Sequence, residues 1–113
     1  MKKNLLTLAL TFLVSSVAQA QFFNGNQLYS WLISADSNES TMGYTYIAGV
    51  SDTGTGVNHC FGKGVTVRQI GDTVLAAMKE HPTVRNQPAD AIVQVVLKIN
   101  WPCKASPGSD RQL

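Results

Sequence analysis

The chain has 113 residues, of which 44% are hydrophobic and 14% charged, and its formal net charge at pH 7 is +2. Two of its nine basic residues lie in a segment that we expect to be removed, which leaves seven Lys and Arg against seven Asp and Glu. A neutral chain without a basic cluster lacks the phosphate-neutralising charge that nucleic-acid binding requires. We therefore expect no nucleic-acid partner.

Residues 1–20 have the pattern of a cleaved signal peptide. Two lysines precede an uncharged apolar run, Leu5–Val17, and Ala18-Gln19-Ala20 supplies a small-x-small cleavage site. A membrane anchor is the alternative, but the run is shorter than the ~20 apolar residues of a spanning helix. The working protein is then a single domain, residues 21–113, in a bacterial periplasm and without a membrane attachment after cleavage.

Cys60 and Cys103 are the only cysteines in the chain. In an oxidising compartment we expect them to form one structural disulfide, worth roughly 4 kcal/mol on the chain-entropy model. No C-x-x-C redox motif is present, and the possible zinc ligands His59, Cys60, His81 and Cys103 are scattered rather than paired. We expect no metal ion and no cofactor.

A short helix is predicted for Gln27–Leu32, with Asn26 as its capping residue. Leu28, Trp31 and Leu32 share its apolar face. We interpret Trp31 as a core residue rather than a ligand-stacking one, because a small domain needs large apolar side chains in its core.

A loop at Ser34–Ser40 and a second helix at Thr41–Asp52 are expected next, although the alternation in Tyr44–Ile47 leaves a strand open. Ser51–Gly64 has four glycines and almost no aliphatic residues, which predicts an exposed connection. It is not a phosphate-binding P-loop, because no Lys-Ser/Thr pair follows Gly64.

The third helix has the clearest start signal. Thr66 and Gln69 form a capping box, and Val65 and Ile70 have the spacing of a hydrophobic staple. The apolar periodicity continues to about His81, where the following proline disfavours further helix.

After a turn at Thr83–Gln87, Pro88 fits the first position of a fourth helix. The segment Ala91–Ile99 is rich in β-branched residues, so a strand is an open alternative. The recurrence of Asp90, Gln94 and Lys98 every four residues favours a helix with one narrow solvent-facing stripe. We therefore expect an all-α fold, a small four-helix domain closed by one disulfide, followed by a flexible tail at residues 104–113.

A set of short motifs extends over nearly the whole mature sequence. They are Asn24-Gly25 with Leu28-Tyr29 and Trp31, Gly43-Tyr44, Gly49-Val50 with Asp52, Cys60, Gly64-Val65-Thr66, His81-Pro82, Ala89 and Trp101-Pro102-Cys103. In these motifs the chain resembles the Rap1a/Tai family of immunity proteins. Beyond the expected fold, the resemblance implies a small periplasmic protein, often dimeric, that blocks a peptidoglycan amidase toxin delivered by a type VI secretion system. The dipeptide Phe61-Gly62 departs from the family pattern and affects a loop.

No spacing singles out a nucleophile with its base, so we expect no catalytic residue and no enzyme activity. His59 stands next to Cys60, but a disulfide would remove the thiolate. The two loops are instead expected to expose polar and aromatic side chains that contact the toxin, namely Asp52, Asn58, His59, Phe61, Lys63, Arg85 and Asn86.

Two other functions are open. One is a periplasmic acid-stress chaperone, against which the small number of ionisable groups argues. The other is a small secreted hydrolase or accessory factor.

Overall fold

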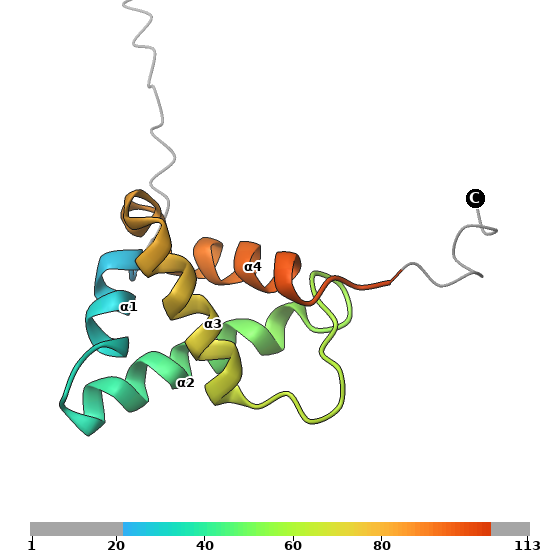
Figure 1. Ribbon diagram of the computed structural model, residues 1–113, viewed down its shortest axis with the longest axis horizontal. Coiled ribbons are helices and arrows are strands. Elements are labelled where there is room, and N and C mark those ends of the chain that lie inside the picture. The colour runs from blue at the N-terminus through green and yellow to red at the C-terminus, as the bar shows by residue number, and fades with distance from the viewer. Residues whose placement is uncertain (1–21, 105–113) are drawn as a thin grey trace, which may run out of the picture.

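The computed structural model describes residues 22–104, within which the chain forms four α-helices, one 3-10 helix and no β-strand (Figure 1). The prediction of an all-α, four-helix fold is confirmed. The expected signal peptide and nearly all of the expected tail lie outside the described residues. None of the described helices combines the length and the hydropathy needed to cross a membrane. The elements are α1 (Gly25–Leu32), α2 (Ser37–Gly54), α3 (Val67–Glu80), η1 (Pro82–Asn86) and α4 (Ala89–Asn100).

Helix α1 is capped by Asn24 rather than by Asn26. The Asn24 side chain accepts a hydrogen bond from the Gln27 amide at 3.0 Å, and the Gln27 side chain accepts one from the Asn24 amide at 3.3 Å. This reciprocal capping box satisfies two amides that the helix itself leaves unpaired. The prediction of Asn26 as the cap is wrong, because Asn26 lies inside the helix and donates to Asn86 at 3.1 Å.

Helix α2 begins four residues earlier than expected. Asp36 is its cap, with one carboxylate oxygen accepting from the amides of Asn38 at 2.8 Å and Glu39 at 3.3 Å. The prediction of a loop at Ser34–Ser40 is therefore wrong from Ser37 onward, because the cap offsets the weak helix propensity of the first turn. The alternative of a strand at Tyr44–Ile47 is excluded.

Helix α3 begins as predicted, with the capping box of Thr66 and Gln69 in place. It crosses α2 closely because Gly71 has no side chain. The Tyr44 ring occupies the space that a Cβ atom at Gly71 would need, and its hydroxyl donates to Asp72. Burial and this hydrogen bond both raise the pKa of Tyr44 above its ordinary value.

Gly49 of α2 differs from Gly71. Apart from the adjacent residues and the nearby backbone of α2 itself, a Cβ atom at Gly49 would meet no atom of the described residues within 4 Å. A glycine inside a helix costs about 1 kcal/mol relative to alanine. No packing contact among the described residues explains why a glycine stands at this position.

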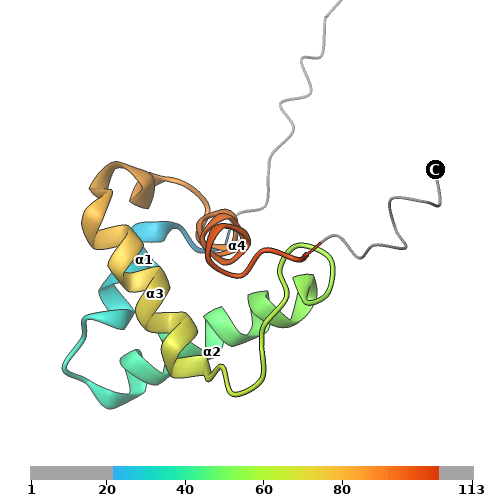
Figure 2. The same ribbon diagram turned by 45° about the vertical axis from the view of Figure 1, so that its right-hand side comes forward.

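The helices enclose one apolar core, with α3 crossing α2 in both ribbon views and α4 lying to one side of α3 (Figures 1 and 2). Trp31 packs half-buried against it, edge to face with Phe23 at a centroid distance of 4.9 Å. The buried core side chains are Leu28, Leu32, Ile47, Ile70, Val74, Met78, Ala89, Ile92, Val93, Val96 and Leu97.

Helix α4 is confirmed as a helix, with Pro88 just before its first residue, and the preceding turn is η1. Its solvent-facing side is wider than the predicted polar stripe. Val95 and Ile99 are 58% and 71% exposed, and Ala91 is exposed one turn before Val95. We call these three residues the α4 face.

Candidate partner-binding surfaces

The disulfide between Cys60 and Cys103 ties the segment after α2 to the end of α4. The two Cα atoms lie 4.8 Å apart, and the Cys60 amide donates to the Trp101 carbonyl at 2.8 Å. The predicted pairing is confirmed. Closing 43 residues of chain reduces the entropy of the unfolded state by an amount worth about 4 kcal/mol on the chain-entropy model.

The segment between α2 and α3, residues 55–66, begins with a tight turn. The amides of Asn58 and Gly56 donate to the carbonyls of Gly54 and His59, each at 2.8 Å. Gly56 has φ of +85°, a conformation that favours glycine. We call residues 55–65 the braced loop, because the contacts described next hold it against α2 and α4.

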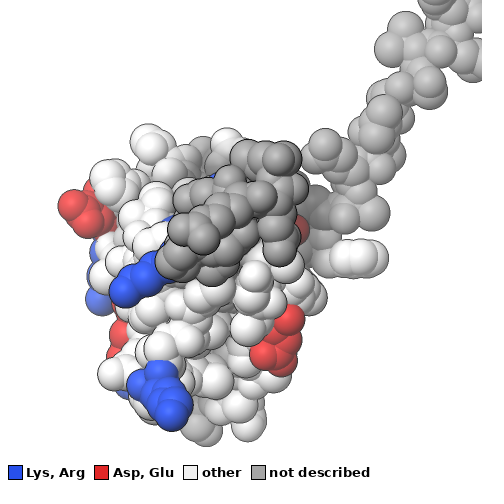
Figure 3. Space-filling model, turned by 90° about the vertical axis from the view of Figure 1, so that its right-hand side faces the viewer, with Lys and Arg blue, Asp and Glu red and all other residues white. Residues whose placement is uncertain are grey.

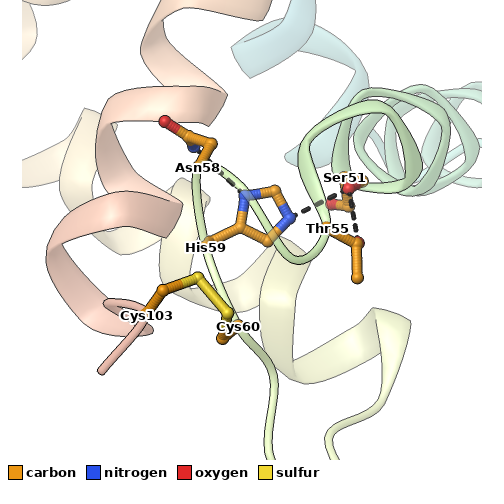
Figure 4. The surroundings of a disulfide bond; sticks show 6 residues. All are labelled: Ser51, Thr55, Asn58, His59, Cys60 and Cys103. Atoms are coloured by element: carbon orange, nitrogen blue, oxygen red, sulfur yellow. Dashed lines mark hydrogen bonds between the residues drawn. A yellow bond between two sulfur atoms is a disulfide. The ribbon is translucent and has the colours of Figure 1, made fainter. Parts of the chain in front are cut away.

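His59 is the centre of these contacts and has no exposed surface. Its Nε2 lies 2.9 Å from the Ser51 carbonyl oxygen of α2, and its Nδ1 lies 3.1 Å from the side-chain nitrogen of Asn58 (Figure 4). A carbonyl can only accept and an amide nitrogen can only donate, so these partners assign the neutral tautomer with its proton on Nε2.

Asn58 extends the brace to α4, because its side-chain nitrogen also donates to the Gln94 carbonyl at 3.0 Å. The Phe61 ring continues these contacts. It is tilted against the His59 ring at a centroid distance of 4.7 Å and meets the Trp101 ring edge to face at 5.4 Å. The loop is thus fixed on both sides by hydrogen bonds, ring packing and the disulfide.

The prediction that the loop residues are exposed is confirmed for Asp52 and Lys63. It is wrong for His59, which is fully buried, and only half correct for Asn58 and Phe61, which are half-buried. The glycines do not keep the loop away from the core, because Gly54 lets the His59 ring approach its backbone closely.

The two other predicted contact residues lie at the opposite end of α4. Arg85 is half-buried, donates to the Met78 carbonyl at 2.9 Å and places its guanidinium 3.6 Å from the Tyr29 ring centroid. Asn86 is exposed and bonded to Asn26. Helix α4 is about 18 Å long at 1.5 Å per residue, so the seven predicted residues form two separate groups.

Charges are sparse on the side of the molecule that faces the viewer in Figure 3. Where the described residues are in view, separate basic and acidic side chains stand on a mostly uncharged surface, with no extended patch of one sign. Contacts on this face therefore depend on shape and on single charges rather than on a strong field.

Two apolar grooves flank α4, and sequence reasoning missed both. The first, which we call the α2–α4 groove, has a volume of about 730 Å³. Its walls come from the N-terminal segment, α1, α2 and α4, including Phe23, Trp31, Met42, Tyr46, Gly49 and Asp90. The second, the α3–α4 groove, has about 430 Å³ and contains the α4 face together with Ala77, Glu80 and Val84. The chain contains more apolar residues than its core buries, which hints at exposed apolar surfaces. The sequence alone does not show which of these residues stay exposed.

Tyr46 stands in the α2–α4 groove and responds to the charge there. Burial raises the pKa of the Tyr46 hydroxyl, the Asp90 carboxylate raises it further, and hydrogen bonding to the Asp90 backbone acts in the opposite direction. The negative charge of Asp90 is therefore close enough to be felt by a side chain that lines the groove.

Ser51 and His59 are not arranged as a catalytic pair. The Ser51 hydroxyl donates to the Ile47 carbonyl at 2.7 Å, and His59 bonds the Ser51 backbone rather than its hydroxyl. In residues 22–104 no three His, Cys, Asp or Glu side chains gather closely enough to hold a metal ion.

Replacement of His59 by alanine should lower the free energy of unfolding by about 3 kcal/mol, because it leaves a cavity and removes one hydrogen bond each from the Ser51 carbonyl and the Asn58 side chain. His81, the other histidine, is exposed, and its replacement by alanine should change stability by less than about 0.5 kcal/mol. Urea unfolding followed by circular dichroism, with the disulfide intact, measures both. Equal effects of the two substitutions would contradict a bracing role for His59.

Comparison with known proteins gives one match. Residues 24–103 match the family model of the Rap1a immunity proteins, while neither the curated proteins nor the solved structures contain a match. The matched segment covers well over half of the chain and includes all four helices, the braced loop and both cysteines. Membership implies a type VI secretion immunity protein that binds a cognate toxin effector. The chain belongs to the Rap1a immunity protein family.

Proposed function

We propose that the protein binds and inhibits a peptidoglycan amidase toxin in the periplasm. The family match over residues 24–103 is the observation that carries the proposal. The disulfide supports the compartment, because such cross-links persist outside the reducing cytoplasm. The amidase as target is what the sequence motifs of the family imply.

In this proposal the braced loop enters or covers the active-site cleft of the toxin. Asp52, at the end of α2, and Lys63, in the loop, are exposed and supply direct contacts. Asn58, His59 and Phe61 hold the loop in one shape before the toxin arrives. A loop that is already ordered loses less conformational freedom on binding, which strengthens the complex.

Arg85 and Asn86 form a second, separate contact region under the same proposal. Arg85 is already engaged with Tyr29 and the Met78 carbonyl, so it presents a fixed cation rather than a flexible one. The braced loop and this second region lie at opposite ends of α4. One toxin molecule therefore contacts both regions only if its surface extends along the whole helix. The protein acts by occupying a site on the toxin, not by chemistry of its own.

A growth assay tests the function. A panel of amidase toxins is exported into the periplasm of a sensitive host, with and without this protein, and lysis is recorded. We expect rescue from at least one toxin. The Lys63→Glu variant should weaken binding of that toxin at least roughly tenfold, about 1.4 kcal/mol, because it reverses a contact charge.

Lys79→Glu is the matched control, because it makes the same change at an exposed position of α3 away from the loop. It should rescue as well as the wild type. Lysis in the presence of the folded, exported wild-type protein across the whole panel would contradict the amidase target. An unchanged affinity of Lys63→Glu for the neutralised toxin would contradict the loop contact.

We further propose that the working form is a homodimer, joined through the α4 face. Ala91, Val95 and Ile99 recur every four residues, so two copies can pack this face against itself about a two-fold axis. Sedimentation equilibrium should give a dimer for the wild type and a monomer for Val95→Glu. Ser37→Glu adds the same carboxylate to an exposed position of α2 and should remain dimeric. A monomeric wild type would refute the dimer.

A further inference from the structure

The α2–α4 groove has the character of a docking site. It exposes apolar side chains side by side rather than singly, with Met42 49% and Phe23 37% exposed and the rings of Trp31 and Tyr46 half-buried beside them. Concave, apolar and aromatic surfaces of this kind mark binding sites on soluble proteins. The groove is also separate from the α4 face, which lies in the other groove.

The floor of the groove admits close approach. Gly49 lies there without any neighbour that requires a glycine, unlike Gly71, whose missing side chain makes room for Tyr44. Thr45 and Thr53 line the groove one helical turn on either side of Gly49. Small side chains at this spacing allow the backbone of a second helix to lie close against α2.

The charges around the groove indicate which sign of charge a binding partner should carry. Among the residues that line it, Asp90 alone carries a formal charge. Asp52 and Glu39 on α2 and Lys98 on α4 each stand one helical turn from a lining residue, but none of the three lines the groove itself. The groove therefore favours a cation.

We propose that the α2–α4 groove receives a basic amphipathic helix of the toxin, with small or apolar side chains over Gly49 and a lysine or arginine facing Asp90. This inference rests on the proposed function and specifies the partner's chemistry. The groove is continuous with the proposed contact loop, because Gln94 lines the groove and its carbonyl holds Asn58. One binding partner can therefore use both.

A second copy of the chain fits the groove less well. Helix α2 contains two carboxylates and no lysine or arginine. Pairing α2 with its own copy about a two-fold axis would bring like charges together and leave Asp90 without a cation. A helix from a different protein, with basic residues on one side, satisfies both the shape and the charge.

The first test uses synthetic peptides as probes of the full mature protein. One peptide is an amphipathic helix of leucine, alanine and lysine, and the other has glutamate in place of every lysine. Amide chemical shifts in nuclear magnetic resonance spectra locate binding. We expect the lysine peptide to shift amides of α2 and the first turns of α4, and the glutamate peptide to shift none of them.

Variants separate shape from charge. Gly49→Leu should abolish binding of the lysine peptide, whereas Ala76→Leu, at an exposed position of α3, should leave it unchanged. Asp90→Asn should weaken binding several-fold, and Glu80→Gln, which makes the same change in the other groove, should not. Gly49→Ala should keep the fold and raise the melting temperature, which separates blocked binding from misfolding.

The proposal is overturned if the lysine peptide causes no shifts, if it shifts only the α3–α4 groove, or if the glutamate peptide binds equally. A second arm uses an amidase toxin from which the wild type rescues cells. If Gly49→Leu inhibits that toxin as well as Ala76→Leu does, the groove proposal fails while the function stands. If no toxin is blocked but the lysine peptide binds the groove, the function fails and the preference for a basic helix stands.

Discussion

The hydrogen bonds of one buried histidine connect the parts of this protein that we propose to meet the toxin. His59 bonds α2 through the Ser51 carbonyl, and its neighbour Asn58 bonds α4 through the Gln94 carbonyl. The disulfide fixes the next residue to the end of α4. A glycine-rich loop without such contacts would lose much conformational entropy on binding. Here that entropy is already lost when the protein folds, so binding the toxin costs less.

The same brace positions the groove. Ser51 and Thr53 lie in the last turns of α2, and Gln94 lies in the middle of α4, so the contacts that hold the loop also set the separation of the two helices that form the groove walls. Asp52 is exposed between these groups, next to Thr53, which lines the groove. Loop and groove are thus two parts of one proposed interface rather than independent sites.

Local signals in the sequence predicted the local structure well. The capping box at Thr66 and Gln69 located the start of α3, and the spacing of Asp90, Gln94 and Lys98 identified α4 as a helix. The start of α2 was missed because serine and asparagine are weak helix formers and the stabilising contribution comes from the Asp36 cap. The pairing of the two cysteines followed from their number and the expected compartment.

The candidate surfaces were less predictable, because they depend on how the helices pack. A histidine between glycines in a polar segment indicates an exposed loop, and only the proximity of α2 and α4 buries His59. Val95 and Ile99 have the same residue types as the core positions of α4, so periodicity alone does not show that they stay exposed. The Gly49 position is similar, since its open surroundings become visible only once the neighbouring helices are placed.

Hydrogen exchange of the mature protein, measured alone and in complex with an amidase toxin that it neutralises, decides whether the braced loop and the α2–α4 groove together bind the toxin. We predict slower exchange on binding in the braced loop and along the groove side of α2, with the active-site cleft of the toxin protected in the same complex. Protection confined to the exposed side of α3, with the loop and α2 unchanged, would show that the toxin binds elsewhere.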